Sequence, residues 1–369
     1  MKIGIDLRMA GGDYGIGSYA LQLVHKILAI DRNNDYILFV RQPEKFQNMA
    51  FALHKNVRLV RADYQHYSAE EQTLFYRLLS KHNLDLVHFT NFNVPIMYNK
   101  PFVVTIHDMI HHKLPGNKPS RFLHRLAYKL VMRHAALASK KIITVSNFSK
   151  KEITETYNLP RNKIEVIYEA ATPVPVTDSD LAEVQQKFGI AKPYIIFVGV
   201  MERKKNVFAL TKAFDLLKEK YLLDIQLVLA GKPDRHYPEI LEQAQAINYR
   251  RDLVITGSVS EKEKYALYKG AQAFVSASLF EGFGLPGVEA MSLGTPLIVS
   301  NIAVFNEVYD NGAIYFDPQD PDDIAQKINL LLGDNKYRQL IANNAYQRAQ
   351  YFSWDAAARQ TIGVYEQCA

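Results

Sequence analysis

Two glutamates, Glu281 and Glu289, frame the stretch of this sequence that is richest in chemistry, SASLFEGFGLPGVEAMSLGTPLIVSN at positions 276–301. The glycines of this stretch next to the two acids are Gly282, Gly284 and Gly287. Glycines let backbone N–H groups approach a ligand closely, and Pro286 suits the first turn of a helix, whose N-terminus favours phosphate. Carboxylates instead accept hydrogen bonds from hydroxyl groups. The spacing therefore predicts a ligand that carries a sugar on either side of a diphosphate.

A run of basic residues follows the apolar stretch YIIFVG, in the sequence VGVMERKKN at positions 198–206. Ligands of open parallel sheets bind beyond the carboxyl ends of the strands. Arg203, Lys204 and Lys205 would therefore lie at the edge of the sheet where a ligand binds, and their positive charges suit an anionic group. The guanidinium of Arg203 also has the planar geometry for a bidentate phosphate contact. The alternative is a solvated basic patch.

The polar pair His107–Asp108 stands directly after another apolar run, PFVVTI. Its place at the expected carboxyl end of a strand favours a binding site. The same residue types are also comfortable in an ordinary turn at the end of a strand, so the sequence leaves both interpretations open.

Two patterns resemble metal sites, and neither meets the requirements of one. His111 and His112 would need other ligands to converge on them in space, which the sequence does not show. Asp178–Ser179–Asp180 has the form D-x-D but lies in a linker, where it suits linker chemistry or a helix cap. We therefore predict no metal.

The elements that position these residues alternate between strand and helix almost throughout. Continuous apolar runs such as KIGIDL, YILFV, LDLVHFT and KIITVS indicate strands that are covered on both faces, as in parallel α/β sheets. The proline-containing stretch AATPVPVTDSD interrupts the alternation, and the pattern then restarts. The sequence thus predicts an α/β protein of two Rossmann-like, doubly wound domains that face each other across a cleft.

The length supports two domains, because a chain of 369 residues is too long for one ordinary core. We place the first domain at residues 1–172, a linker and first helix at 173–190, and the second domain at 191–353. The C-terminal helix, at about 354–369, is expected to pack back on the first domain.

The composition, with 48% apolar and 22% charged residues, is that of a soluble globular protein. Cys368 is the only cysteine, so neither an intramolecular disulfide nor a thiolate cluster can form, and a reducing, cytoplasmic location is expected. The net charge of +6 is uneven: residues 1–170 hold 24 Lys and Arg against 14 Asp and Glu, a net +10, which leaves −4 for the rest. The first half is therefore expected to meet an anionic partner.

Much of this charge lies in KPSRFLHRLAYKLVMRHAALASKK, positions 118–141, which contains no acidic residue. Arg121, Arg125 and Lys129 recur every four residues and so share one helix face. The leucines that lie elsewhere on the helix are Leu126, Leu130 and Leu137. Such a helix suits an anionic membrane surface or an anionic acceptor, and a solvated face is the alternative. No recognised nucleic-acid motif accompanies the charge, so nucleic acid is not expected.

Near the N-terminus, GDYGIGSYALQL has Gly15, Gly17 and Ala20 in the form G-x-G-x-x-A of a dinucleotide-binding loop. That motif turns straight from strand to helix, whereas the residues MAGGDY separate Gly15 from the strand KIGIDLR. The next strand is followed by Arg41, which could suit NADP, so an NADP-dependent oxidoreductase is one alternative. The glycines also suit a close approach of the backbone at a helix N-terminus, where Ser18 could act as the cap, and a flexible connector before the helix is the other alternative.

Together these motifs resemble the retaining glycosyltransferases of the GT-B fold in glycosyltransferase family 4, mannosyltransferase-like branch. The pair Glu281 and Glu289 is similar to their E-x7-E signature, and the resemblance spans nearly the whole chain. The further segments that resemble the branch, in its order, are TIHDMIHHKLP, ITVSNFSKKEI, FVGVMERKKNVFALTKAF, LVLAGK, GSVSEKEKYALYKGAQAFV, AIYFDPQDPDDIAQKI and FSWDAAARQT. One departure is that many members read E-P-R-K-N where this chain reads ERKKN at 202–206.

The resemblance implies that Glu281 hydrogen-bonds the hydroxyls of the donor sugar and that Glu289 binds the ribose of the nucleotide. It implies that Lys205, with Arg203 second, neutralises the diphosphate, and that His107 reaches the donor sugar or the reaction centre. The other residues expected at the donor are Phe283, Gly284, Leu285, Gly15, Gly17 and Lys204. Those expected on the acceptor or membrane side are Asp108, Arg121, Arg125 and Lys129.

The resemblance thus predicts a retaining glycosyltransferase that moves a hexose of mannose or glucose type from a GDP- or UDP-linked sugar. The expected acceptor is a saccharide or a polyprenyl-linked saccharide in cell-envelope polysaccharide or glycan assembly. No cofactor beside the nucleotide sugar is expected. The expected location is the cytoplasm, with peripheral attachment to the inner face of the membrane as an option. A non-catalytic basic protein that binds a membrane surface is the second alternative.

Overall fold

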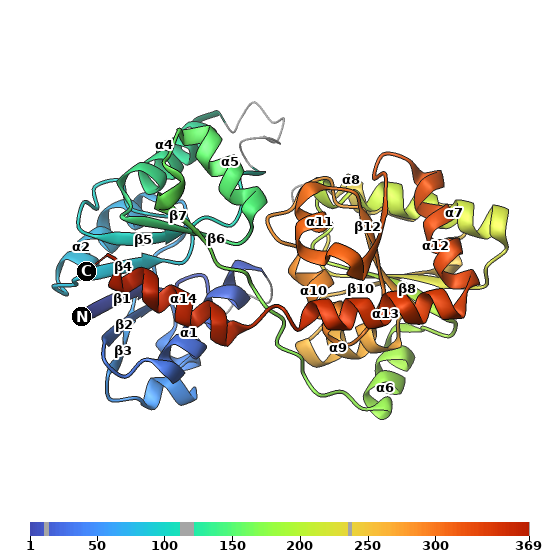
Figure 1. Ribbon diagram of the computed structural model, residues 1–369, viewed down its shortest axis with the longest axis horizontal. Helices are drawn as coiled ribbons and strands as arrows, with labels where there is room; N and C mark the ends of the chain where they lie inside the picture. The colour runs from blue at the N-terminus through green and yellow to red at the C-terminus, as the bar shows by residue number, and fades with distance from the viewer. Residues whose placement is uncertain (11–14, 111–121, 235–237, 369) are drawn as a thin grey trace. The chain divides into compact units, whose positions relative to one another are not determined.

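The computed structural model describes residues 1–10, 15–110, 122–234 and 238–368, which form two compact units (Figure 1). The first unit comprises Met1–Glu169 and Ser353–Ala369, and the second comprises Ala170–Phe352. The end of the chain therefore belongs to the first unit. The predicted candidates His111, His112 and Arg121 lie outside the described residues.

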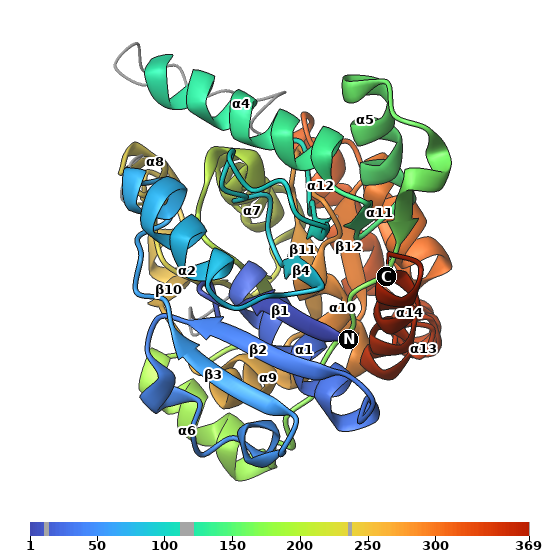
Figure 2. The same cartoon turned by 90° about the vertical axis from the view of Figure 1, so that its left-hand side faces the viewer.

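The first unit is built on seven parallel strands in the order β3-β2-β1-β4-β5-β6-β7, of which Figure 2 shows β1, β2 and β3 side by side. The strands are β1 (Lys2–Asp6), β2 (Asp35–Val40), β3 (Val57–Arg61), β4 (Leu86–Phe89), β5 (Phe102–Thr105), β6 (Lys141–Thr144) and β7 (Ile164–Val166). The direction in which strands are added reverses between β1 and β4, which makes a topological switch point. Ligands of such sheets bind at this crevice, beyond the carboxyl ends of the strands.

Helices and short turns connect these strands. They are α1 (Ile16–Ile30), α2 (Tyr76–Ser80), α4 (Phe122–Ala138), α5 (Asn147–Tyr157), α14 (Trp354–Glu366), the π-helical turn η3 (Glu71–Phe75), and the 3-10 turns η1 (Pro43–Lys45), η2 (Ala50–Leu53) and η5 (Arg161–Lys163). The C-terminal α14 packs on α1: the rings of Trp354 and Tyr19 are 6.0 Å apart, and Lys26 pairs with Asp355 at 2.9 Å.

The second unit has six parallel strands in the order β10-β9-β8-β11-β12-β13, so its switch point lies between β8 and β11. The strands are β8 (Tyr194–Val198), β9 (Gln226–Ala230), β10 (Leu253–Gly257), β11 (Ala273–Ser276), β12 (Leu297–Ser300) and β13 (Ala313–Phe316). The helices are α6 (Asp178–Phe188), α7 (Val207–Tyr221), α8 (Glu239–Gln245), α9 (Glu261–Gly270), α10 (Leu285–Ser292), α11 (Ala303–Tyr309), α12 (Pro321–Gly333) and α13 (Asn335–Ala349). The 3-10 turns are η6 (Arg203–Lys205), η7 (Arg250–Asp252) and η8 (Asp310–Gly312). This architecture confirms the prediction of two Rossmann-like domains.

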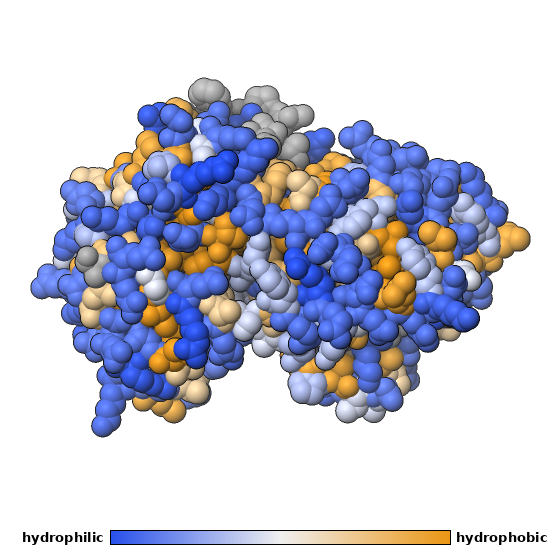
Figure 3. All heavy atoms as spheres, in the orientation of Figure 1, coloured by the Kyte–Doolittle hydropathy of each residue, from blue (hydrophilic) through white to orange (hydrophobic). Residues whose placement is uncertain are grey.

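The sequence pattern explains why these segments adopt helix and strand. In α7 the apolar residues Leu210, Phe214 and Leu217 recur at helical spacing and are fully buried against the sheet. Each such burial contributes roughly 1.5–3 kcal/mol. The strands YIIFV and QLVLA are buried throughout, as expected for strands that are covered on both faces. Hydrophilic residues predominate on the face of the molecule drawn in Figure 3, with apolar patches between them.

Two helix starts can be compared with the sequence. The segment Asp178–Ser179–Asp180 was predicted to precede the helix as its cap, but it forms the first turn of α6, and the N-cap is Thr177. Thr177 accepts from the backbone N–H of Asp180, and Asp180 accepts in return at 2.8 Å, so the triplet takes part in the capping through Asp180. The predicted cap at Ser18 is wrong. The N-cap of α1 is Gly15, with φ 72°, and Ser18 lies within the helix. Glycine accepts this left-handed conformation, which a residue with a Cβ would resist.

Helix α4 exposes part of its apolar surface. Leu126, Leu130 and Leu137 are 47%, 51% and 44% exposed. The side of α4 that packs on the unit is formed instead by Met132 and its small neighbours, Ala135 and Ala136. Within the described part of the chain, no helix is long and apolar enough to cross a membrane.

Candidate active site

The switch point of the second unit brings together two residues that lie 76 positions apart. Lys205 follows β8 and Glu281 follows β11, and Lys205 Nζ donates to Glu281 Oε1 at 2.5 Å. Ser278 Oγ donates to the same oxygen at 2.8 Å. The side chains of Lys205 and Glu281 are 13% and 11% exposed, so the pair is sheltered but in contact with solvent. These are the two residues to which the resemblance gives the principal catalytic roles.

Electrostatics keep Glu281 ionised. Burial opposes ionisation, but the positive charges of Lys205 and Lys204, with hydrogen bonds from Lys205 and Ser278, outweigh it and lower the pKa of Glu281. Lys204, which was ranked below Arg203 on the basis of the sequence, thus acts on the charge of Glu281 directly. Arg203, preferred over Lys204 on the basis of its planar fork, is exposed.

The backbone fixes where these charges stand. The peptide N–H of Leu279 donates to the carbonyl oxygen of Lys204 at 2.7 Å, which ties the loop after β11 to the turn after β8. Asn206 ends that turn with φ 51°, a left-handed conformation that asparagine tolerates, and its Nδ2 donates to the carbonyl of Pro318 at 2.7 Å. Because both loops are held by their main chains, the lysine side chains are presented at a defined place.

Two positions of the glycine-rich segment require glycine. Gly284 is the N-cap of α10 with φ 95°, and its carbonyl accepts from the hydroxyl of Tyr309 at 2.6 Å. A Cβ at Gly284 or Gly287 would lie 2.2 or 2.4 Å from that hydroxyl oxygen, closer than any real contact. Phe283, buried, packs edge-on against Phe352 with ring centroids 5.5 Å apart, and Leu285, half-buried, begins α10. The Tyr309 hydroxyl therefore packs directly against the backbone at both of these glycines.

Glu289 lies within α10 and is buried, with 7% exposure. Lys264 Nζ donates to its Oε1 at 2.8 Å, and the hydroxyl of Tyr268 donates to its Oε2 at 3.1 Å. Burial raises the pKa of Glu289, and the charge of Lys264 partly offsets this effect. Sequence reasoning missed Lys264 and Tyr268, because they lie on α9 and no local signal links them to a glutamate more than 20 positions away.

In the first unit, His107 and Asp108 follow β5. His107 Nδ1 lies 3.3 Å from Glu169 Oε1 and its Nε2 lies 3.1 Å from the carbonyl oxygen of Thr90, while the ring of Tyr19 stands edge-on at 4.6 Å. The neighbours of both ring nitrogens, a carboxylate oxygen and a carbonyl oxygen, are hydrogen-bond acceptors. Asp108 Oδ1 accepts from the N–H of Ile110 at 3.0 Å.

Glu169 was also missed, although a signal was available. It follows the apolar strand β7, IEV, by three residues, so the rule that singled out His107 after its strand would have pointed to it. The remaining predicted residues of this unit are placed as follows. Gly15 starts α1, Gly17 is buried in it, Arg125 is half-buried on α4, and Lys129 is exposed there.

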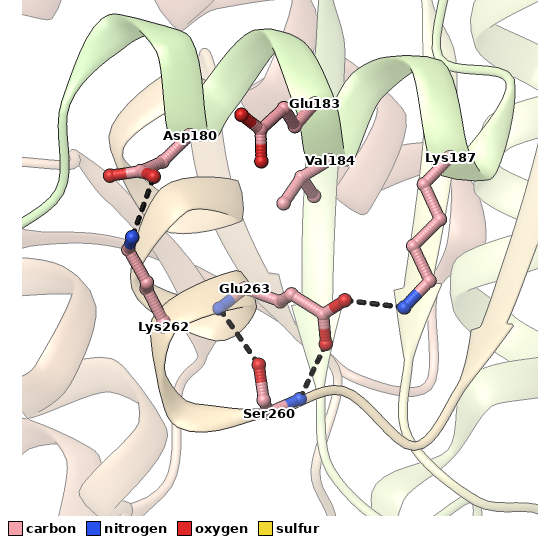
Figure 4. Close-up of a pocket in the computed structure, with 7 residues that line it drawn as sticks. All are labelled: Asp180, Glu183, Val184, Lys187, Ser260, Lys262 and Glu263. Atoms are coloured by element: carbon pink, nitrogen blue, oxygen red, sulfur yellow. Dashed lines mark hydrogen bonds and ion pairs between the residues drawn. The ribbon is translucent and has the colours of Figure 1, made fainter.

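A pocket of about 180 Å³ between α6 and α9 is a different kind of feature (Figure 4). Its charges are paired with each other: Lys262 with Asp180 at 2.7 Å, and Lys187 with Glu263 at 2.5 Å. None of the residues that line it is a predicted site residue. Among the described residues, no group of three His, Cys, Asp or Glu is arranged to hold a metal ion.

Two parallel-sheet units, with a basic turn and a glutamate-framed loop at the switch point of the second, define a glycosyltransferase of the GT-B class. The model of glycosyltransferase family 4 matches residues 14–171, and that of glycosyl transferases group 1 matches residues 180–348. The chain belongs to glycosyltransferase family 4, as the resemblance predicted. Membership in this family favours glycosyl transfer over the oxidoreductase alternative and over a purely non-catalytic protein that binds a membrane surface.

Relatives and solved structures agree with this assignment. O-antigen chain mannosyltransferase B of Escherichia coli is 32% identical over 288 residues, which are 76% of this chain and 74% of the relative. O-antigen chain mannosyltransferase RfbU of Salmonella typhimurium is 32% identical over 239 residues, or 64% and 62% of the two chains. HepE of Anabaena, solved in complex with UDP-glucose, has the same fold with a TM-score of 0.75 at 17% identity, and all of both chains is covered.

Proposed function

We propose that this enzyme transfers a hexose, of the mannose type, from a nucleotide-diphosphate sugar to a saccharide acceptor with retention of the anomeric configuration. The observation that carries the proposal is the contact between Lys205 and Glu281 at the switch point of the second unit, next to the glycine-rich start of α10. This arrangement offers positive charge and backbone N–H groups to a diphosphate and a carboxylate to sugar hydroxyls. The names of the two O-antigen relatives support the mannose type and a role in polysaccharide assembly.

In the transfer, the bond from C1 of the sugar to the leaving phosphate oxygen breaks and a bond from the acceptor oxygen to C1 forms on the same face. The proton of the acceptor hydroxyl passes to the leaving phosphate. Lys205 and Lys204 stabilise the charge that develops on that phosphate, and the exposed Arg203 adds to it. Glu281 accepts hydrogen bonds from the donor sugar, and Glu289 accepts them from the ribose.

The proposal is tested with GDP- and UDP-linked mannose and glucose, by thermal shift of the full chain and by analysis of products. One donor should raise the melting temperature, and NMR of the product should show the anomeric configuration of that donor. An inverted product would refute retention. Absence of binding by every nucleotide sugar would refute the function.

Variants test the site itself. Glu281→Ala and Lys205→Ala should each lower transfer by about 10²-fold or more, since each removes a group that acts on developing charge. Lys187→Ala is the matched control. Like Lys205, Lys187 pairs with a glutamate, but it is exposed and lies on α6. Near-normal turnover in both site variants would contradict the assignment, provided that far-UV circular dichroism shows an intact fold.

We further propose that α4 contacts an anionic membrane surface, where a lipid-linked acceptor would lie. The exposed leucines Leu126, Leu130 and Leu137 share one face of α4, and the exposed cations Lys129 and Arg133 border it. Apolar side chains next to cations are the usual composition of an interfacial helix. Anionic phosphatidylglycerol vesicles should sediment the protein, and neutral phosphatidylcholine vesicles should not. Lys129→Glu with Arg133→Glu should abolish sedimentation, and unchanged sedimentation would favour a solvated face.

A further inference from the structure

The first unit has its own switch point, between β1 and β4, and a buried ionic network fills it. Arg8 follows β1 and is 2% exposed; its Nε and Nη2 donate to the carboxylate of Asp6 at 2.9 and 2.7 Å. Nη2 also donates to Glu71 Oε1 at 2.8 Å, and the guanidinium lies 3.7 Å from the centroid of the Phe75 ring. Nη1 of Arg8 is buried and has no hydrogen-bond partner among the described residues. Apolar side chains often fill such a volume at a lower free energy, so this network indicates a role beyond packing.

Glu71 connects the network to the surface at Tyr67. The second carboxylate oxygen of Glu71 accepts from the backbone N–H of Tyr67 at 2.9 Å. Tyr67 has φ 60°, a left-handed conformation that is unfavourable for a bulky residue. Glu71 itself begins the π-helical turn η3, a form that occurs frequently at functional sites. The buried ions thus hold one aromatic residue in a strained backbone conformation, and such strain clusters at binding sites.

Tyr67 is 61% exposed, yet it is fixed at several points. Its ring lies 5.9 Å from that of Phe92, which lies 5.1 Å from that of Tyr128 on α4. Burial raises the pKa of Tyr67, and hydrogen bonds with Asn91 and Asn93 act on the hydroxyl, so the hydroxyl end is sheltered although most of the residue is open to solvent. An exposed ring that is fixed in this way is a rigid platform.

The groups around the platform determine what it can bind. Asp108 is close enough to both Tyr67 and Tyr128 for its charge to raise their pKa values. Its Oδ1 accepts from the N–H of Ile110, and a carboxylate has further lone pairs for the hydroxyls of a ligand. Among the described residues of this network, the three carboxylates of Asp6, Glu71 and Asp108 face one guanidinium, that of Arg8, and one imidazole, that of His66, whose Nδ1 lies 3.5 Å from Glu71 Oε1. A neutral ligand rich in hydroxyls therefore suits the site better than a phosphate.

We propose that the switch point of the first unit is a pyranose-binding subsite, in which Tyr67 stacks on the apolar face of a sugar ring and Asp108 accepts hydrogen bonds from its hydroxyls. The inference rests on the proposed function in one respect, namely that the bound sugar is the acceptor. An exposed tyrosine side chain contributes little to the free energy of folding. The strain at Tyr67 and the buried ions behind it are therefore explained by ligand binding rather than by a contribution to stability.

The sharpest variant is Tyr67→Asn in the full chain. Asparagine tolerates the left-handed conformation, so the variant should melt at the same temperature as the wild type or higher, although the ring is lost. The probes are methyl α-D-mannopyranoside and methyl α-D-glucopyranoside, observed by saturation-transfer difference NMR. At least one should bind the wild type, and Tyr67→Asn should raise its Kd by about 2- to 10-fold. Tyr67→Trp, which keeps a ring, should bind within about 2-fold of the wild type.

Tyr351→Asn is the matched control, because Tyr351 is 62% exposed but belongs to the second unit. It should leave the NMR signal unchanged. Failure of both glycosides to bind the wild type, or an unchanged Kd in Tyr67→Asn, would overturn the subsite. A lowered melting temperature in Tyr67→Asn would overturn the argument from strain. Donor binding, measured separately by thermal shift with the nucleotide sugars, tests the proposed function and not this inference.

Discussion

At the scale of single residues, Glu289 shows two opposing effects on one carboxylate. Burial raises its pKa, and the ion pair with Lys264 at 2.8 Å lowers it. An acid with a raised pKa becomes protonated at a higher pH than usual, and a protonated carboxyl group is a poorer acceptor for ribose hydroxyls. The KM for the donor should therefore rise as the pH falls through this pKa. Lys264→Met removes the offsetting charge and should move the acidic limb of kcat/KM to higher pH.

The measurement is the pH profile of kcat/KM with the donor varied. Lys264→Arg keeps the charge and should leave the acidic limb where it is in the wild type. Lys262→Met is the control on the same helix, since Lys262 is more exposed and pairs with Asp180 instead. Coincident limbs for Lys264→Met and the wild type would show that Lys264 does not control Glu289.

Glu169 and His107 form a second pair whose coupling can be measured. Glu169→Gln keeps the shape of the side chain but removes the charge 3.3 Å from His107 Nδ1, so transfer should fall. If Glu169 acts through His107, the effects of Glu169→Gln and His107→Ala should not add. The expected interaction free energy is about 0.5–3 kcal/mol. The control is Glu165→Gln, which removes a carboxylate of β7 paired with Lys141 and should combine additively with His107→Ala. Additivity in both cycles would separate Glu169 from the site.

At the scale of elements, the start of α10 depends on the absence of two Cβ atoms. Both Gly284→Ala and Gly189→Ala place alanine in a left-handed backbone conformation. At Gly284 the new methyl group also meets the Tyr309 hydroxyl, whereas at Gly189, at the end of α6, the space around it is open. Gly189→Ala should lower the stability of the second unit by about 1–2 kcal/mol. Gly284→Ala should lower it more and weaken nucleotide-sugar binding, as measured by thermal shift. Equal effects of the two variants would refute the steric role of Tyr309.

The same loop shows what the sequence could predict and why. Local signals were sufficient for the strands, for the loop at 281–289 and for a helix start near Asp178–Ser179–Asp180, because periodicity, glycine and cap chemistry are read within a few residues. The rule that ligands bind beyond the carboxyl ends of parallel strands drew attention to the segment after β8, and in the structure Lys205 of that segment contacts Glu281 after β11. The predicted cap, Ser18, lies three residues beyond the observed N-cap, Gly15, because the ends of helices are the least certain part of a sequence-based assignment.

Contacts between distant segments could not be predicted. Lys264 reaches Glu289 from another helix, and Arg8 reaches Glu71 across 63 positions. Each position looks unremarkable in its own segment, since a lysine on a helix and an arginine after a strand are normally solvated. For a related reason the sequence left open whether the leucines of α4 are buried or exposed. Periodicity identifies an apolar side, but it does not say whether the side covers a core or remains exposed.

At the scale of the whole molecule, the first unit is discontinuous and the second is not. The first unit needs Ser353–Ala369, in which the Tyr365 hydroxyl lies 2.7 Å from His88 Nδ1 and Trp354 is buried near Tyr19. Burial lowers the pKa of His88 to about 3, so this contact is made by a neutral ring at ordinary pH. Apart from Gly15 and Gly17 at the start of α1, and His107 after β5, the residues that we assign to the donor lie in the continuous second unit.

A chain that ends at Phe352 should therefore lose the first unit and keep the donor site. Each large side chain of α14 contributes roughly 1.5–3 kcal/mol by burial, and a few of them equal the 5–15 kcal/mol that stabilises a typical domain. Calorimetry should show two transitions in the full chain, of which the nucleotide sugar raises only one. In the truncated chain the other transition should be lost, while the donor still shifts the one that remains. Removal of residues 367–369 alone, beyond α14, is the control and should preserve both. Loss of nucleotide binding on truncation at Phe352 would show instead that the second unit depends on the first for its fold or its site.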